Sequence, residues 1–213
     1  MSSTWPPALD STSRFRNLPR SRRLRIGLLG GSFDPPHSAH LAISRTALAR
    51  LRLDQVWWLV SPRNPLKGAP TANLKQRLNL AQHIASHPRV LPTAVEVASS
   101  TTFTRDTLRW IVRRAPTCRF VWLMGADNLR NFHRWRAWRE IARIVPIAVF
   151  DRPEATFSAS QSPAALALRT RRTREPSAAT LASRRPPAWV FLHTKRLAVS
   201  STALRTSARL EKP

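Results

Sequence analysis

The sequence has few glycines, one cysteine and no long apolar run, and these shortages exclude several classes of protein. A single cysteine, Cys118, rules out an internal disulfide framework and favours a reducing compartment. No apolar run approaches the roughly 18 residues that a membrane helix needs, and the N-terminal segment has no apolar stretch typical of a secretory signal. We therefore expect a cytoplasmic protein that does not bind membranes.

Acidic residues are also scarce, because 11 Asp and Glu stand against 36 Lys and Arg, for a net charge of +25. Such an excess favours a polyanionic partner. Much of it falls in residues 10–25 and 152–187, which are rich in Ser, Ala, Pro and Arg and have weak periodicity. We predict that residues 1–23 form a basic, disordered tail and that about 152–187 form a basic Ala/Arg/Pro-rich surface loop. The charge then belongs to a solvated surface, and we expect no nucleic-acid partner.

Between residues 24 and 213, apolar strand-like runs alternate with helical segments, and this length suits a single domain. The alternation predicts βαβ units with right-handed crossovers. The expected fold class is α/β, a Rossmann-like parallel sheet with helices on both faces. The expected strands are 24–29, 55–61, 89–98, 119–125, 145–151 and 188–193, and the expected helices are 39–53, 73–87, 104–115, 134–144 and 200–210.

The stretch GGSFDPPHSAH (30–40) follows the first expected strand and contains two of the 5 glycines. It is the first strand-to-helix turn of the sheet, at the carboxyl edge where such folds bind ligands. Gly30 and Gly31 permit backbone angles and close approaches that a Cβ would forbid. His37 and His40, three residues apart around the helix start, can donate to phosphate oxygens beside the free helix amides. The alternative is a pair of surface or capping histidines.

This stretch resembles the G-x-F-D-P-x-H-x-G-H signature of the nucleotidylyltransferase superfamily, with Ala39 in place of the last glycine. It has neither the ending of a P-loop nor the G-x-G-x-x-G dinucleotide fingerprint. Four later blocks, in order, are similar to the family of bacterial nicotinate-nucleotide adenylyltransferases. They are SPRNPLKG (61–68), TFTRDTLRWI (102–111), MGADNLRNFHRWRAWREI (124–141) and VSSTALR (199–205).

The resemblance implies transfer of the adenylyl group of ATP to nicotinate mononucleotide, which gives nicotinate adenine dinucleotide (deamido-NAD) and pyrophosphate in NAD biosynthesis. Such a reaction depends on positioning and charge neutralisation and needs no protein nucleophile. Mg²⁺ bound with ATP would bridge its phosphates. No His, Cys or Asp cluster has transition-metal spacing, so we expect no metal site on the chain itself. The expected partners are ATP and nicotinate mononucleotide. A homo-oligomer is possible, and the sequence does not decide the oligomeric state.

By the same resemblance, His37 and His40 are the catalytic residues, and a wider set binds ATP. Residues 200–202 would present Ser and Thr hydroxyls at the start of the last helix, with Arg205 one turn on; the alternative is an ordinary helix cap. Lys67 is either a phosphate clamp or a loop lysine. The ATP-binding set is Gly30, Gly31, Ser32, Phe33, His37, His40, Lys67, Gly125, Ser200, Ser201, Thr202 and Arg205.

The nicotinate mononucleotide side of the site is likewise carried over from the resemblance. Trp135 would stack on the pyridine ring, with Thr104 near it. Backbone N–H groups of Arg105 and Arg136 would receive the carboxylate, and their side chains would add a positive field that favours acid over amide. Asp127 would hydrogen-bond the mononucleotide; the alternative is an N-cap role.

Three other tryptophans, Trp57, Trp58 and Trp138, are expected in the core. Other acceptors remain alternatives, namely pantetheine phosphate, glycerol phosphate or nicotinamide mononucleotide. A class I aminoacyl-tRNA synthetase would need a further tRNA domain, for which 213 residues leave no room. A basic nucleic-acid-binding protein would explain the charge but not the glycines and histidines at one strand end.

Overall fold

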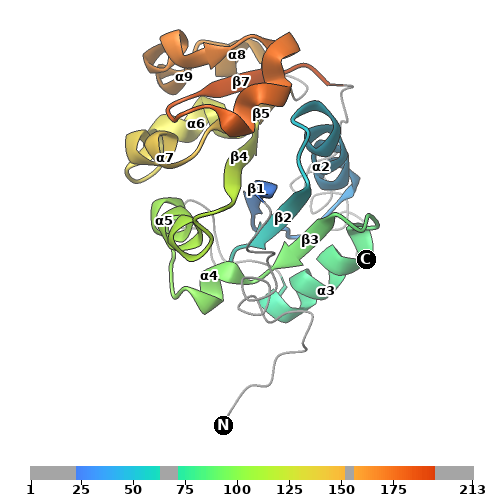
Figure 1. Ribbon diagram of the computed structural model, residues 1–213. Helices are drawn as coiled ribbons and strands as arrows, with labels where there is room; N and C mark the ends of the chain where they lie inside the picture. Colours follow the sequence, from blue (N-terminus) through green and yellow to red (C-terminus); the bar gives the residue numbers. More distant parts are fainter. Residues whose placement is uncertain (1–22, 63–71, 152–155, 195–213) are drawn as a thin grey trace, which may run out of the picture.

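The computed structural model describes residues 23–62, 72–151 and 156–194. Seven parallel strands form one sheet in the order β3-β2-β1-β4-β5-β7-β6 (Figure 1). The strands are β1 (Arg25–Gly31), β2 (Gln55–Val60), β3 (Val90–Thr93), β4 (Arg119–Gly125), β5 (Ile147–Phe150), β6 (Arg172–Thr173) and β7 (Trp189–Leu192). This topology confirms the predicted Rossmann-like parallel sheet.

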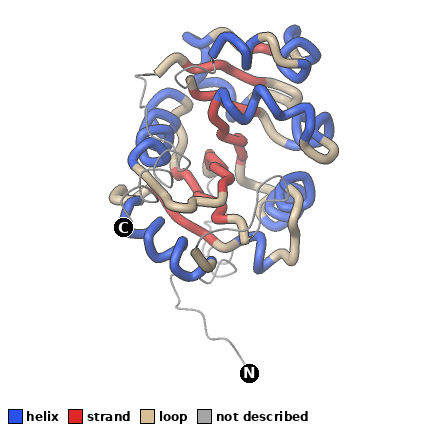
Figure 2. The backbone as a smooth tube through the Cα atoms, turned by 180° about the vertical axis from the view of Figure 1, so that it is seen from behind, coloured by secondary structure: helices blue, strands red, loops and turns tan. Residues whose placement is uncertain are grey.

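Helices cover both faces of the sheet, as Figures 1 and 2 show. The α-helices are α2 (Ser38–Arg50), α3 (Leu74–Ile84), α4 (Val95–Ala98), α5 (Thr104–Arg114), α6 (Ala126–Asn131), α7 (Trp138–Ile144), α8 (Thr156–Ser160) and α9 (Pro163–Ala167). The 3-10 helices are η2 (Phe132–Arg134), η3 (Arg169–Arg171) and η4 (Glu175–Ser183).

The core consists of two layers, one on each face, because side chains alternate along every strand. In β4, for example, Trp122 packs into one layer and Val121 and Leu123 into the other. The first layer also contains buried residues of α5 to α9, and the second contains those of α2, α3 and η4. Trp57 and Trp58 enter opposite layers with 1% and 0% exposure, which confirms their core assignment.

Most predicted elements differ from the observed ones by one to three residues at their ends, and two differ more. The run 89–98 is not one strand, because β3 ends at Thr93 and α4 begins at Val95. The helix predicted over 134–144 begins only at Trp138, since Ala137 has a left-handed backbone (φ 53) that interrupts it. The predicted last helix, 200–210, lies outside the described residues.

The prediction of a surface loop over 152–187 is wrong for its described part. From Thr156 onward the chain forms α8, α9, η3, β6 and η4, and β6 pairs with β7 at the edge of the sheet. Ala164, Ala178 and Leu181 are at most 2% exposed. Alanines are small enough to let these short helices approach the sheet closely, so an Ala-rich segment packs without long apolar side chains.

Candidate active site

The site lies where the order of the strands reverses. From β1 the chain continues to β2 on one side, whereas β4 lies on the other side of β1. In parallel sheets of this kind the crevice at the carboxyl ends of the two diverging strands binds ligands. The turn 32–37 follows β1 at this edge, and Gly125 ends the adjacent β4, whose Leu123 is in register with Leu29.

Gly30 and Gly31 are the last residues of β1 rather than part of the turn. Neither has a positive φ, so the expectation of special backbone angles is not met. Close packing explains both residues. A Cβ on Gly30 would lie 2.4 Å from Cη2 of Trp122, and one on Gly31 would lie 3.3 Å from Cε2 of Phe33.

Phe33 anchors the turn to the core. It adopts a left-handed backbone (φ 47) and is 1% exposed. Its ring stacks on Trp58, with centroids 5.1 Å apart, and lies 4.5 Å from the ring of His40. A strained backbone at a buried residue persists only where packing holds it, so Phe33 fixes the path of the turn into α2.

His37 and His40 come together at the start of α2, with ring centroids 3.9 Å apart. His37 is the N-cap, and its carbonyl accepts from the N–H of His40 at 3.0 Å. In return, the N–H of His37 donates to Nδ1 of His40 at 3.2 Å. Because Nδ1 accepts this bond, a neutral His40 carries its proton on Nε2. The histidines are thus capping residues and also present an Nε2–H donor at the sheet edge.

A buried chain of hydrogen bonds supports this end of α2. The indole Nε1 of Trp58 donates to Oγ of Ser44 at 2.7 Å, and that hydroxyl donates to the carbonyl of His40 at 2.8 Å. The backbone of His40 is therefore tied to β2 as well as to its own helix.

The second group of predicted residues surrounds the start of α5 and the segment before α7. Thr104 and Arg105 are the first two residues of α5, whose N–H groups have no acceptor within the helix. The guanidinium of Arg136 lies over the ring of Phe103, 4.5 Å from its centroid. The structure thus brings together the two segments that were predicted to receive the carboxylate.

The side chain of Arg105 is not a free positive charge. It forms an ion pair with Asp106 at 2.8 Å and lies 4.0 Å from a carboxylate oxygen of Glu140, which also pairs with Arg109 at 2.7 Å. Two carboxylates therefore offset much of its field, which weakens the expected contribution of this side chain to acid preference.

Gly125 and Asp127 lie at the carboxyl end of β4. Gly125 is the N-cap of α6, and Asp127 lies in the first turn of that helix, so the alternative N-cap role of Asp127 is excluded. A carboxylate in the first turn of a helix is stabilised by the helix dipole.

Trp135 is partly buried and packs against the core. Trp138 is only 8% exposed, which confirms the prediction that it belongs to the core. The ring of Trp135 meets Trp122 edge-on at 6.3 Å and Phe132 at 5.4 Å. Trp135 therefore combines a fixed ring with partial exposure, as a stacking platform requires.

Five predicted ATP-binding residues lie outside the described residues. They are Lys67, Ser200, Ser201, Thr202 and Arg205.

Sequence reasoning missed two buried charged residues at this edge, Arg77 and Glu96. Glu96 follows β3, is 8% exposed and forms a hydrogen bond with Ser61, which follows β2. Burial raises the pKa of the Glu96 carboxyl to about 7, and the bond with Ser61 opposes this only in part. The predicted strand 89–98 included Glu96, so sequence reasoning did not place this carboxylate at the end of a strand. Arg77 lies three residues after Leu74 and four before Ala81, on the apolar face of α3, and this spacing was the signal that the sequence did offer.

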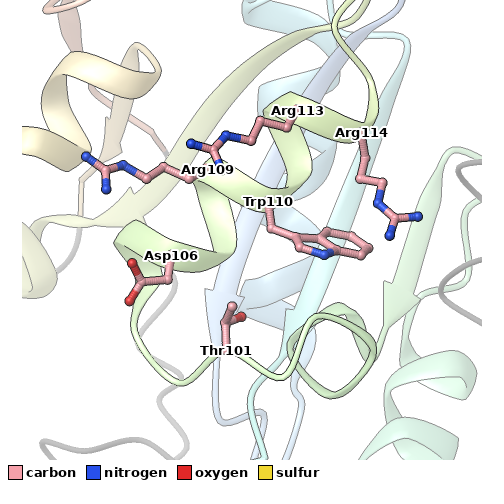
Figure 3. A pocket seen from close by; sticks show the side chains of 6 residues that line it. All are labelled: Thr101, Asp106, Arg109, Trp110, Arg113 and Arg114. Atoms are coloured by element: carbon pink, nitrogen blue, oxygen red, sulfur yellow. The ribbon is translucent and has the colours of Figure 1, made fainter.

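A separate pocket of about 460 Å³ lies against the outer face of α5 (Figure 3). Trp110 and Arg114 lie next to each other along one side of it, with the guanidinium 4.8 Å from the ring centroid. None of the residues predicted to bind ATP or substrate lines this pocket. Its lining is Thr101, Asp106, Arg109, Trp110, Arg113 and Arg114.

Within the described part of the chain, no three His, Cys, Asp or Glu side chains group in a way that could hold a metal ion. None of its helices is long and apolar enough to cross a membrane.

The fold and this edge define a class of nucleotide-transferring α/β proteins, and comparison with known proteins places the chain in it. Residues 28–207 match the family model described as "Cytidylyltransferase-like", and the chain belongs to this family.

Within the family, this chain is a relative of the nicotinate-nucleotide adenylyltransferases, which confirms the sequence resemblance. It is 54% identical to a "Probable nicotinate-nucleotide adenylyltransferase" of Methylorubrum extorquens (strain PA1), over 86% of this chain and 100% of the relative. A protein of the same name from Bradyrhizobium sp. (strain ORS 278) is 52% identical, over 85% of this chain and 95% of the relative.

A solved structure has the same fold. It is the Plasmodium falciparum nicotinic acid mononucleotide adenylyltransferase complexed with NaAD, with a TM-score of 0.65 and 16% identity, over 86% of this chain and 83% of that one.

Proposed function

We propose that this protein transfers the adenylyl group of ATP to nicotinate mononucleotide, giving nicotinate adenine dinucleotide and pyrophosphate. The observation that carries the proposal is the 54% identity to a named nicotinate-nucleotide adenylyltransferase along that relative's whole length. The geometry at the ends of β1 and β4 supports it. We infer that the reaction takes place in the cytoplasm.

The histidine pair acts on the phosphates of ATP. His40, protonated on Nε2, donates to a phosphate oxygen, while the N-terminal amides and dipole of α2 add positive potential at the same place. The mononucleotide phosphate is already an oxyanion, so the chain has to align it with the α-phosphorus and stabilise charge on the leaving oxygens.

The start of α5 and the segment before α7 receive the nicotinate. Trp135 stacks its ring on the pyridine ring, and the backbone N–H groups of Arg105 and Arg136 donate to the carboxylate. Fixed amide donors favour an acid, because the NH₂ of a nicotinamide would leave one donor facing another.

We infer that the phosphate oxygens of ATP would hold Mg²⁺ at this site. Mg²⁺ binds readily to phosphate oxygens and keeps several waters, and it neutralises phosphate charge when bound.

The test is to incubate the purified protein with ATP, Mg²⁺ and one of three acceptors, and to measure pyrophosphate. Nicotinate mononucleotide should be the best acceptor, with nicotinamide mononucleotide weaker and pantetheine phosphate inactive. A faster reaction with pantetheine phosphate, or no reaction with any acceptor, would overturn the proposal.

A further inference from the structure

The most unusual side chain outside the predicted site is Arg77 of α3. It is 1% exposed although it carries a guanidinium. Burial lowers the pKa of Arg77, and the nearby carboxylate of Asp34 opposes this shift. An arginine nevertheless stays charged at neutral pH, so a full positive charge lies inside the protein. Burying such a charge is unfavourable unless its donors are satisfied.

Within the described part of the chain, the hydrogen bonds of this guanidinium go to backbone carbonyls. Nη1 donates to the carbonyls of Ser32 and Ser61, the latter at 2.7 Å. Nη2 donates to Pro62 at 3.1 Å, and Nε donates to Ala72 at 3.0 Å.

These acceptors belong to two different loops at the carboxyl edge. Ser32 begins the turn after β1 that leads to the histidines, and Ser61 and Pro62 follow β2. The ladder between the two strands extends one step further, because the N–H of Ser61 donates to Gly31 at 3.0 Å. Beyond that step, the carbonyls of Ser32 and Ser61 are both acceptors and cannot bind each other. Arg77 supplies the donor that joins them.

We propose that Arg77 is a positioning residue: it holds the turn after β1 at a fixed place beside β2 and so sets where the ATP phosphates lie against His37 and His40. The inference rests on the proposed function, since it assigns a role within the same site. Arginine suits this role because its planar fork reaches several acceptors at once, whereas a lysine ammonium is a single point charge.

The sharpest variant is Arg77→Lys, which keeps the charge and loses the fork; Arg77→Met removes both. Two matched controls are available. Arg89→Ala removes an arginine that donates to the carbonyl of Leu53 at 3.4 Å, before β2 begins. Leu181→Ala removes a fully buried side chain of η4 and so lowers stability without touching the turn.

We expect Arg77→Lys to lower kcat by roughly 10- to 100-fold and to raise the KM for ATP, because small displacements of reacting groups have effects of this size. The KM for nicotinate mononucleotide should change less than about twofold, since its groups lie on α5 and before α7. Amide hydrogen exchange should rise in residues 30–40 and stay unchanged in 104–114. Both controls should keep the wild-type kcat.

Wild-type kinetic constants in Arg77→Lys, or exchange that rises equally everywhere as in Leu181→Ala, would overturn the proposal. If Arg77→Met does not fold, the lysine variant still decides. Different results would overturn the proposed function and the proposed role of Arg77. A wild-type protein that forms no pyrophosphate would overturn the function. The hydrogen-exchange comparison tests the positioning role of Arg77 and needs no turnover.

Discussion

The N–H of His37 donates to Nδ1 of His40 at 3.2 Å, so one histidine sets the proton position of the other. The bond makes Nδ1 an acceptor and leaves Nε2–H as the donor of the His40 ring. A helix-capping contact and a candidate phosphate contact thus share one imidazole.

Replacing His40 with alanine should reduce turnover by on the order of 10²–10³-fold, because it removes a donor to charge that develops in the transition state. The variant should still fold, but its melting temperature should fall because the N–H of His37 loses its acceptor at the start of α2. The measurement is kcat for pyrophosphate release beside a thermal melt. His83→Ala, an exposed histidine of α3, is the control and should have no effect. Near-normal turnover in His40→Ala would show that His40 does not stabilise the transition state.

Glu96→Gln should change how stability depends on pH. The folded-state pKa of about 7 lies above the ordinary value of 4.5, so the folded protein holds a proton that the unfolded chain has lost. The contribution of Glu96 to wild-type stability should therefore be most favourable below pH 4.5 and decrease as pH rises to about 7. The glutamine variant lacks this decrease and should melt higher than the wild type at pH 8 but not at pH 4.5. A parallel pH profile for both proteins would contradict this account.

Glu175→Gln should show the opposite sign. Burial alone would raise the pKa of Glu175, but hydrogen bonds from His193 and Arg50 outweigh it and lower the pKa below 4.5. Its hydrogen bond with His193 at 2.6 Å and its ion pair with Arg50 at 3.0 Å stabilise the fold above that pH and are weakened as pH falls below it. We expect a lower melting temperature than wild type at pH 7 and a smaller difference at pH 3. An equal difference at both values would show that the charge of Glu175 is not responsible.

Acid preference should depend little on either arginine side chain. Arg105 already faces Asp106 and Glu140, and Arg136 packs over an aromatic ring. Arg105→Ala and Arg136→Ala should each raise the KM for nicotinate mononucleotide modestly and keep the acid preferred. The measurement is kcat/KM for the acid and the amide. A variant that prefers the amide would show that the arginine side chain, and not the backbone N–H group, recognises the carboxylate.

Trp135→Ala should weaken both mononucleotides by a similar factor, because an aromatic face stacks equally on acid and amide. The expected loss is about 1–3 kcal/mol of stacking. The same kcat/KM comparison decides it. If both values stay at wild type, the pyridine ring does not stack on Trp135.

Deleting residues 158–180 should abolish soluble, folded protein. The deletion removes β6 and α9 together with buried Ala164 and Ala178. Soluble yield and the melting temperature measure the effect. Phe157→Ser is the control, because this side chain is 81% exposed and its loss should leave the melt unchanged. A deletion variant with the wild-type melt would restore the interpretation of this segment as a loop.

What the sequence predicted well is local in the chain. The strands have runs of Val, Ile, Leu and Trp, and the turn after β1 and the residues after β4 follow such runs directly. The position of the histidine pair at the start of α2 could therefore be predicted without any tertiary information.

What it missed depends on distant partners or on atypical packing. Arg77 binds carbonyls of residues 16 and 45 positions away. The helical period places it on the apolar face of α3 with Ala81 and Ile84, but no local pattern identifies these distant acceptors. The segment η4 lacks the 3.6-residue period because it is a 3-10 helix, and its buried positions are mostly alanines. Composition alone made it resemble a loop.

The contact between Gly30 and Trp122 has a consequence for how this sequence can vary. The indole lies where any side chain at position 30 would begin, 2.4 Å from the Cβ that an alanine would add. The two positions are therefore sterically coupled, because an alanine at 30 requires the indole at 122 to move or to be replaced by a smaller side chain. Gly30→Ala alone should be defective, and Trp122→Leu should partly rescue it by opening the space, so the double variant should lose less stability than the sum of the two single losses.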